Sequence, residues 1–324
     1  CDPVLNKVVS QVMENLPPET LFTYPESASL YKKLADWLGL NPENLVLTAG
    51  SDGAIRSVFE AFISPGDVVI HTQPTFAMYP VYCKMYGASA HELAYRISAN
   101  GPDLQVRDIL EAIEKFSPRL ICLPNPDSPT GTITKPEELL DVIATAGRYG
   151  AVMLVDEAYY PFYDETVIGL VNEYPSLIVT RSTGKAWGMA GFRIGYAAAS
   201  PEVIATLHKV RPMYEANTIG VAAFEGMLDH VVDMQQSIKR INLGKENFLN
   251  EMQEFGFSIL RGHGNFLHVS FGEQANEVHA ALADLVYYRK DFKEPCLRGF
   301  SRFSAAPPDQ MERIVERIRQ TLKK

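Results

Sequence analysis

The chain has 324 residues, of which 46% are hydrophobic, and its formal net charge is -9. This length suits one large domain with a smaller companion, and the apolar content is sufficient for a sizeable core. An acidic surface repels phosphate backbones, which argues against a nucleic-acid partner. No apolar run reaches the roughly 18 residues that a membrane span needs, so we expect no contact with a membrane.

Cysteine usage indicates a reducing compartment. The four cysteines, Cys1, Cys83, Cys122 and Cys296, are far apart in the sequence. There is no Cys-x-x-Cys pair and no Cys/His cluster, so we expect neither a metal site nor a disulfide framework. Reduced thiols in a cytoplasmic protein are the simplest interpretation.

The predicted elements begin with two helices joined by a loop. Apolar positions recur at helical spacing over residues 4–16 and 29–38, and Pro17, Pro18 and Pro25 break the pattern between them. From residue 45 onward, short apolar segments alternate with helical ones. The strands are expected at 45–48, 68–71, 88–93, 120–123, 152–155, 177–180 and 196–199, and the helices after Ser51, around 76–86, at 108–115 and at 136–149.

Short, fully apolar strands between helices are typical of a mostly parallel sheet that is buried on both faces. The pattern then changes to a long helical region over 201–250. Strands near 257–260 and 266–271, a helix at 276–286, a segment ending in Arg302–Ala305 and a final helix from 308 follow. We therefore predict a large domain at 41–205 and a smaller α+β domain at 206–324, preceded by an N-terminal segment at 1–40.

A glycine-rich segment follows the predicted strand at 177–180. It runs from Arg181 to Gly195 and contains Ser182, Lys185 and Arg193. In an open α/β sheet, ligands bind at the carboxyl ends of the strands. A hydroxyl and a guanidinium can bind one phosphate, while an amine can condense with a carbonyl group. Taken alone, the segment would serve equally well as a surface loop with ordinary cations.

An aspartate follows the buried strand at 152–155. Asp156 precedes Glu157 and, after one alanine, Tyr159. A carboxylate in this position can keep a pyridinium nitrogen protonated, which makes the ring an electron sink, and the hydroxyl of Tyr159 could reach a phenolic oxygen on that ring. The alternative is that Asp156 caps the next helix. Glu157 is interpreted as structural.

Three further turns follow predicted strands. Asn125–Gly131 forms a rigid turn, Thr48–Gly53 offers backbone N–H groups at a helix N-terminus as a phosphate cradle, and Gln73–Phe76 offers an aromatic face. Each is weak alone, since Gly-Ser turns are common and Phe76 would more often belong to a core. Together, the five turns point to one crevice at the edge of the sheet.

These motifs resemble those of the fold-type-I enzymes that use pyridoxal 5'-phosphate (PLP), in the aspartate aminotransferase superfamily, and within it the histidinol-phosphate aminotransferase group. The resemblance runs from about residue 5 to the C-terminus, and its most specific parts are the lysine segment and the Asp156–Tyr159 pair. It implies a mostly parallel seven-stranded sheet between helices, with a smaller α+β C-terminal domain. It also implies a transaminase of amino-acid biosynthesis that moves an amino group between an amino acid or phosphorylated amino alcohol and a 2-oxo acid such as 2-oxoglutarate.

The resemblance assigns roles by position. Lys185 would form the Schiff base with PLP and act as the general acid and base, Asp156 would pair with the pyridine nitrogen, and Tyr159 would bind the phenolic oxygen. Phe76 would stack on the ring. Arg193 and Ser182 would bind the cofactor phosphate, helped by the backbone of Ser51 and Asp52, and Gly50 would belong to the same cofactor site.

Further roles concern the subunit partner and the substrate. Tyr24 matches a tyrosine that this group donates to the phosphate in the neighbouring subunit, which implies a homodimer with shared active sites. Residues 1–40 would pack on that partner and on the small domain. Arg302 matches the arginine that binds the substrate carboxylate, and in the histidinol-phosphate group Arg302 and Arg289 would hold the substrate phosphate. A surface salt bridge is the alternative for Arg289, and Arg298 competes for either role.

The sequence departs from the family pattern at two positions of the cofactor site. Ser128 stands where an asparagine usually binds the phenolic oxygen, and Asn125 is an alternative donor if the turn is rearranged. Gly184 stands where the group usually has a serine. The sequence also begins after the N-terminal segment that this group folds over its substrate, so the resemblance leaves the amino donor open.

Two other functions are consistent with the same residues. A PLP-dependent decarboxylase of the threonine-phosphate type would use the same machinery, because the orientation of the substrate decides which bond breaks. A PLP-binding regulatory domain of the kind fused to winged-helix repressors is the alternative from another class, although no basic helix-turn-helix segment is present.

Overall fold

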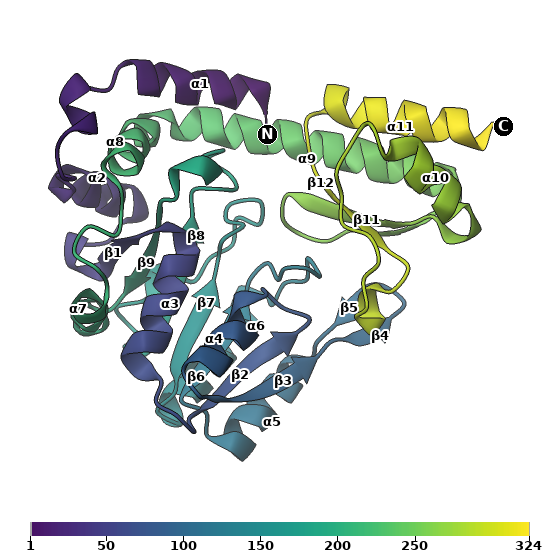
Figure 1. Ribbon diagram of the computed structural model, residues 1–324. Coiled ribbons are helices and arrows are strands. Elements are labelled where there is room, and N and C mark those ends of the chain that lie inside the picture. Colours follow the sequence, from purple (N-terminus) through teal and green to yellow (C-terminus); the bar gives the residue numbers. More distant parts are fainter. Residues whose placement is uncertain (1, 324) are drawn as a thin grey trace.

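The computed structural model describes residues 2–323 and contains a seven-stranded sheet and a separate three-stranded sheet (Figure 1). The strand order in the large sheet is β1-β9-β8-β7-β6-β2-β3. Its strands are β1 (Leu45–Thr48), β2 (Val68–Gln73), β3 (Ser89–Ala94), β6 (Leu120–Pro124), β7 (Val152–Asp156), β8 (Leu177–Ser182) and β9 (Gly195–Ala199).

The large sheet is mostly parallel, as predicted. Strands β3, β2, β6, β7 and β8 pair in parallel, whereas β9 runs antiparallel to both of its neighbours, β8 and β1. Every residue of β6, β7 and β9 is buried. Continuous apolar strands of this kind are stable only where helices cover both faces of the sheet.

Helices cover the two faces of the large sheet in separate layers. One apolar cluster joins the sheet to α3 (Gly50–Phe62), α4 (Met78–Met85) and α7 (Pro201–Val210). The opposite cluster joins it to α5 (Val106–Phe116), α6 (Pro136–Arg148) and α8 (Thr218–Met227). The N-terminal helices α1 (Pro3–Glu14) and α2 (Ala28–Leu38) extend this second cluster by packing against α8.

The ends of several helices follow from local sequence. Asp2 caps α1 by accepting a hydrogen bond from the backbone N–H of Val4 at 3.1 Å. Helices α6, α7 and α11 (Pro308–Leu322) each begin with a proline, whose fixed φ suits the first turn. Helix α2 ends at Gly39, which adopts the left-handed conformation with φ 68°.

The smaller sheet is antiparallel, with the order β10-β11-β12. Its strands are β10 (Ser258–Leu260), β11 (Phe266–Ser270) and β12 (Ser301–Ser304), and its helices are α10 (Ala275–Leu282) and α11 (Pro308–Leu322). The long helix α9 (Val231–Glu254) lies beside α1 at one end and beside α11 at the other, and so connects the two parts of the molecule (Figure 1).

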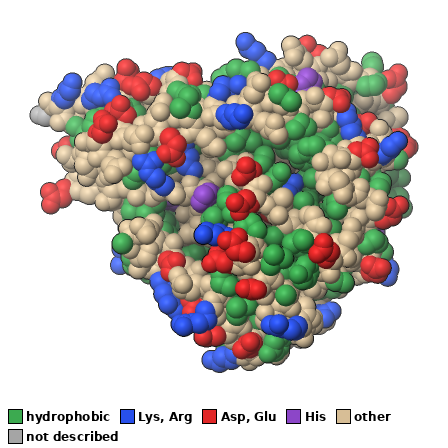
Figure 2. Space-filling model, turned by 180° about the vertical axis from the view of Figure 1, so that it is seen from behind, with side chains coloured by type: hydrophobic (Ala, Val, Ile, Leu, Met, Phe, Trp, Pro, Cys, Tyr) green, Lys and Arg blue, Asp and Glu red, His purple; other side chains and the backbone are tan. Residues whose placement is uncertain are grey.

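A short antiparallel hairpin was not predicted. It consists of β4 (Arg96–Ser98), whose residues are exposed, and β5 (Gly101–Asp103), whose residues are half-buried, and neither three-residue sequence gives an apolar strand pattern. Among residues 2–323, no helix combines the length and the apolar character that crossing a membrane requires. Figure 2 shows acidic and basic side chains intermingled on the rear face, with hydrophobic side chains between them.

Candidate active site

A cavity of about 260 Å³ lies at the carboxyl ends of the parallel strands. Ten residues of the predicted cofactor site line it: Gly50, Ser51, Asp52, Phe76, Ser128, Asp156, Tyr159, Ser182, Lys185 and Arg193. Pro124, Pro126 and Ala158 also line the cavity, although the sequence did not single them out. The prediction that five strand-end turns meet at one crevice is confirmed, because strands that run in parallel present their carboxyl ends at the same edge.

The turn between β1 and α3 forms the side of the cavity that suits an anion. Helix α3 begins at Gly50, so the N–H groups of Ser51 and Asp52 belong to its unpaired first turn. The Nη2 atom of Arg193 lies 3.5 Å from the carbonyl oxygen of Ala49 and 2.9 Å from where a Cβ on Gly50 would be. Glycine at position 50 therefore makes room for the guanidinium beside the helix N-terminus.

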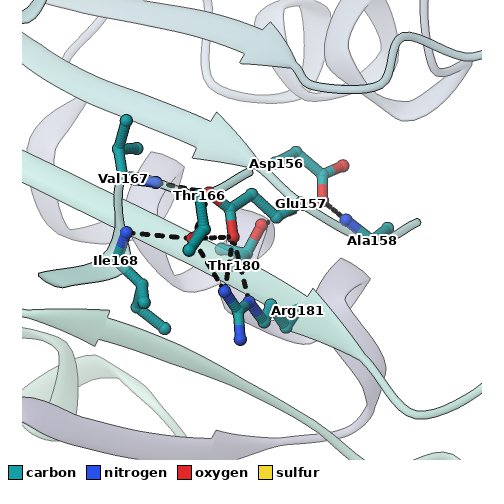
Figure 3. A network of polar contacts seen from close by, with 8 residues as sticks. All are labelled: Asp156, Glu157, Ala158, Thr166, Val167, Ile168, Thr180 and Arg181. Atoms are coloured by element: carbon teal, nitrogen blue, oxygen red, sulfur yellow. Dashed lines mark hydrogen bonds and ion pairs between the residues drawn. The ribbon is translucent and has the colours of Figure 1, made fainter. Parts of the chain in front are cut away.

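Asp156 is buried at the end of β7. Its Oδ1 accepts hydrogen bonds from Thr180 Oγ1 at 3.0 Å and from the backbone N–H of Ala158 at 3.1 Å, the second of which is drawn in Figure 3. Its Oδ2 accepts one from the hydroxyl of Tyr79 at 3.2 Å. Burial raises the pKa of Asp156 to about 6, although these hydrogen bonds and the charge of Lys185 oppose the rise. Oδ2 has one donor and can accept a second from a ligand.

Lys185, Tyr159 and Ser128 lie together on another wall of the cavity. Lys185 is exposed, and its Nζ lies 5.3 Å from the centre of the Tyr159 ring. The hydroxyl of Tyr159 donates to Ser128 Oγ at 3.4 Å, and Nη1 of Arg302 approaches the same oxygen at 3.4 Å. Both distances exceed the roughly 3.0 Å of ordinary hydrogen bonds, so Ser128 connects these two groups loosely.

Of the two predicted substrate arginines, Arg302 belongs to β12 of the smaller sheet, and Arg289 pairs with it in an isolated β-bridge outside the named strands. Arg302 is half-buried in β12 and reaches the cavity only through Ser128. Arg289 is exposed and exchanges two backbone hydrogen bonds with Arg302, while its guanidinium lies over the ring of Phe292 and 3.5 Å from Glu294. Burial lowers the pKa of Arg302, and the nearby positive charge of Arg289 lowers it further.

Tyr24 does not reach the cavity of its own subunit. Its side chain is 71% exposed and stacks on Tyr214, with ring centres 4.2 Å apart. The structure of one chain therefore separates Tyr24 from the other predicted cofactor residues.

The alternative role of Asn125 is wrong. Its side-chain amide donates to the carbonyl oxygen of Thr134 at 3.1 Å, and its Oδ1 accepts from the N–H of the same residue at 2.9 Å. Asn125 closes the loop after β6 and does not line the cavity. At Gly184, a Cβ would lie 3.2 Å from Ala190 Cα and 3.3 Å from Ser182 Oγ, so a serine there would need its neighbours to move.

Sequence reasoning missed the residues that support Asp156. Tyr79 in α4 and Thr180 in β8 hydrogen-bond its carboxylate from elements that are distant in the chain. Thr180 ends the predicted strand directly before the lysine segment, and a hydroxyl at that position was the available signal. Tyr79 gave no signal, because a tyrosine on an amphipathic helix is ordinarily a core residue.

The donor set of the cavity fits PLP. The N-terminus of α3, the Ser182 hydroxyl and the Arg193 guanidinium suit a phosphate, and the amine of Lys185 suits a carbonyl carbon. The raised pKa of Asp156 means that its carboxylate lacks a sufficient cationic partner, which a protonated ring nitrogen would provide. Among the described residues, no three His, Cys, Asp or Glu side chains form a group that could hold a metal ion.

Comparison with known proteins gives a consistent result. The family described as "Aminotransferase class I and II" matches residues 2–318. The chain is 30% identical to the histidinol-phosphate aminotransferase of Thermoanaerobacter pseudethanolicus over 98% of its own length and 89% of the relative's. It is 31% identical to histidinol-phosphate aminotransferase 1 of Carboxydothermus hydrogenoformans over 93% and 84%.

The fold is also that of solved enzymes. The crystal structure of histidinol-phosphate aminotransferase from Sinorhizobium meliloti, in complex with pyridoxal-5'-phosphate, superposes with a TM-score of 0.82 at 22% identity. The superposition covers 99% of this chain and 87% of that one. The chain therefore belongs to the class I and II aminotransferases, and it is a PLP-dependent transaminase of fold type I.

Proposed function

We propose that this transaminase takes a phosphorylated amino alcohol of the histidinol-phosphate type as its amino donor and a 2-oxo acid such as 2-oxoglutarate as its acceptor. The observation that carries this proposal is the pairing of Arg302 in β12 with Arg289 in the β-bridge beside it. Arg302 reaches the cavity edge at Ser128, and Arg289 lies on the adjacent backbone. The positive charge of Arg289 lowers the pKa of Arg302, so the two groups repel each other, and an anion with several oxygens would relieve that repulsion.

We propose the following roles for the residues of the cavity. When bound, PLP supplies a carbonyl that condenses with amines and a ring that accepts the electron pair of a broken bond at the substrate α carbon. Lys185 Nζ holds the cofactor carbonyl carbon between turnovers and moves the α proton during them. Asp156 keeps a proton on the ring nitrogen, and Tyr159 donates to the phenolic oxygen.

The phosphate of the cofactor is proposed to lie at the N-terminus of α3. There the N–H groups of Ser51 and Asp52 can donate to it, together with Ser182 and Arg193. Gly50 leaves the space that Arg193 needs, and Phe76 covers the ring. All these residues line the same cavity, which supports the assignment.

We infer that the active unit is a homodimer in which Tyr24 serves the partner's cavity. Tyr24 stacks on Tyr214, and Leu21, Phe22 and Met213 in the same two segments are also largely exposed. Exposed large apolar side chains gathered in neighbouring segments are typical of a subunit interface. We also propose a division into an N-terminal segment at 1–40, a large domain at 41–205 and a small domain at 206–324, with the difference that α8, in the last of these ranges, packs into the core of the large sheet.

A cytoplasmic location is proposed from the cysteines. Cys83, Cys122 and Cys296 are buried and not paired in disulfides. Burial raises the pKa of the thiols of Cys83 and Cys296 to about 11, which keeps them protonated and unreactive. Thiols of this kind are ordinary in a reducing compartment.

The test is a single-turnover assay with a panel of donors. Purified holoenzyme is mixed with histidinol phosphate, aspartate or phenylalanine, and the visible absorbance of the lysine-bound cofactor is followed. Histidinol phosphate should convert the spectrum fastest, and 2-oxoglutarate should then yield glutamate without carbon dioxide. Release of carbon dioxide from aspartate or phenylalanine, which carry the carboxylate that histidinol phosphate lacks, would instead indicate a decarboxylase. Lys185→Ala should abolish the lysine-bound absorbance, and covalent binding of PLP by that variant would refute the assignment.

Arginine variants test the substrate anchor. Arg302→Met should lower kcat/KM for histidinol phosphate by about 10- to 100-fold, because a charged hydrogen bond contributes ~1.5–3 kcal/mol. Arg298→Met is the matched control, since Arg298 is an exposed arginine of the same segment. A larger effect at Arg298 than at Arg302 would show that the anchor has been assigned to the wrong residue.

A further inference from the structure

A second pair of charged side chains lies directly behind the cavity. Glu157 and Arg181 follow Asp156 and Thr180 in the chain and are 2% and 3% exposed. Nη2 of Arg181 lies 2.8 Å from Oε2 of Glu157, and its Nε donates to the same oxygen at 3.0 Å (Figure 3). This two-pronged contact fixes the orientation of both side chains.

Other residues hold the pair from the remaining sides. The hydroxyl of Thr166 lies 2.8 Å and 2.7 Å from the two oxygens of Glu157 and accepts from Arg181 Nη2 at 2.7 Å. The N–H of Val167 donates to Glu157 Oε1 at 3.0 Å. The guanidinium of Arg181 lies 3.4 Å from the centre of the Tyr160 ring. Both oxygens of the buried carboxylate are therefore satisfied.

Burying two charges costs free energy that their mutual attraction rarely exceeds, so a buried pair is weak evidence of a stabilising role. Its position is more informative. Strands β7 and β8 are neighbours and run in parallel, with Asp156 opposite Thr180. Side chains alternate along a strand, so Thr180 and Ser182 share one side of β8 while Arg181 lies on the other.

The pair thus ties together the same two strand ends that present the cavity residues. On the cavity side, Asp156 accepts from Thr180, and Ser182 lines the wall. On the opposite side, Glu157 and Arg181 are locked to each other. If either strand end shifted, the spacing between Asp156 and the lysine segment would change.

We propose that Glu157 and Arg181 are positioning residues: they clamp the ends of β7 and β8 and so set the placement of Asp156 relative to Ser182 and Lys185. This inference rests on the proposed roles of those three residues. The pair would therefore affect catalysis although neither residue touches the cofactor or the substrate.

Arg181→Lys is the principal variant, because it keeps the positive charge beside Glu157 while losing the two-pronged contact. We expect the folded variant to have a kcat lower by on the order of 10- to 100-fold, since small misplacements of reacting groups have effects of that size, with little change in KM. The pH midpoint of the lysine-bound absorbance should rise. A ring nitrogen less well paired with Asp156 carries less positive charge, and so repels the proton on Lys185 Nζ less.

The double variant Glu157→Gln with Arg181→Met removes both charges. It provides a second test if Arg181→Lys does not fold. The control is Arg240→Lys, which alters another two-pronged arginine contact, between α9 and Asp2, at a site that does not line the cavity. The control should lower stability without moving the absorbance midpoint.

A folded Arg181→Lys protein with the wild-type absorbance midpoint and the wild-type kcat would overturn the inference, however much its melting temperature fell. The proposed roles of the cavity residues fail by a different result. In that case Lys185→Ala would keep the lysine-bound absorbance. The two failures are therefore distinguishable in the same set of experiments.

Discussion

Asp156 shows how one residue can be easy to locate in the sequence and yet depend on distant residues for its chemistry. Its place at the end of a buried strand is a local property of the chain. Its pKa of about 6 arises from burial and is moderated by Thr180 and Tyr79, which come from β8 and α4. A cationic group placed beside a carboxyl with this raised pKa would stabilise its ionised form.

The raised pKa of Asp156 predicts a pH dependence of stability in the cofactor-free protein. The folded-state pKa of about 6 lies above the ordinary 3.8, so the folded state binds the proton more tightly than the unfolded state. This contribution is present below pH 3.8 and is lost as the pH rises through 6. Relative to Asp156→Asn, the wild-type free energy of unfolding should therefore fall by up to about 3 kcal/mol over that interval.

Urea unfolding of both cofactor-free proteins between pH 4 and 7 provides the measurement. Adding PLP should weaken the difference, because a cationic ring nitrogen stabilises the carboxylate. Parallel stability curves for wild type and Asp156→Asn would contradict the raised pKa.

Ser128 stands where the resemblance to the family predicts an asparagine. A serine is shorter than the usual asparagine, and its contacts to Tyr159 and Arg302 are both 3.4 Å. Because these contacts are longer than ordinary hydrogen bonds, we predict that Ser128 would hold the edge of a bound cofactor less tightly than short hydrogen bonds would. The side chain of Asn125 is hydrogen-bonded to the backbone of Thr134, so it does not take the place of the asparagine that the resemblance predicts at position 128.

At the scale of elements, the cavity depends on how closely β9 packs on the start of α3. A Cβ on Gly195 would lie 2.5 Å from the carbonyl carbon of Gly50 and from the backbone nitrogen of Ser51. These are main-chain atoms of the turn that is proposed to bind the phosphate, so they cannot move without moving the site.

Gly195→Ala should therefore affect both stability and cofactor binding. We expect a loss of about 1–3 kcal/mol in the free energy of unfolding, as for other overpacked sites, together with weaker binding of PLP to the folded protein. Gly191→Ala is the control, because a Cβ there meets no atom within 4 Å. Equal effects of the two substitutions would show that the packing of β9 on α3 does not support the site.

A second contact, between α9 and the turn that joins β10 to β11, helps to place the smaller sheet beside the large one. Lys245 in α9 is buried and donates to the carbonyl oxygens of Gly262 and Gly264, the latter at 3.1 Å. Burial lowers the pKa of Lys245 to about 8. The turn that it holds packs against Gly131, which ends the turn that carries Ser128, so α9 helps to set the smaller sheet against the cavity.

At the scale of the whole molecule, the proposed sharing of active sites has a direct test. Lys185→Ala and Tyr24→Phe should each be impaired as separate proteins. In a mixed dimer, the Tyr24→Phe subunit keeps Lys185 and the Lys185→Ala subunit keeps Tyr24. One of the two cavities would then contain both residues and be intact.

The mixing experiment measures activity as inactive Lys185→Ala protein is added to a fixed amount of Tyr24→Phe protein, after dissociation and reassembly. Activity should rise towards that of one wild-type site per mixed dimer. Adding Lys185→Ala protein to wild-type protein in the same way should produce no rise in activity. If Tyr24→Phe is fully active alone, or if its activity does not rise on mixing, the cavities are not shared.

The sequence by itself determined the order of the secondary structure and the location of the site. Apolar strands followed by turns with functional side chains can be read from neighbouring residues, and Asp156, Tyr159, Lys185 and Arg193 do line one cavity. The hairpin β4–β5 was not predicted, because its short strands, exposed in β4 and half-buried in β5, have no apolar periodicity.

Only the tertiary structure decided which side chains pair with which. Glu157 forms an ion pair with Arg181, and Arg302 contacts Ser128, which is 174 positions away in the chain. Asn125 forms a hydrogen bond within its own loop. The tertiary structure also placed β9 antiparallel between β1 and β8. The physical reason is that periodicity and strand ends are set by local geometry, whereas hydrogen-bond partners depend on how elements pack, and packing involves residues that no local pattern connects.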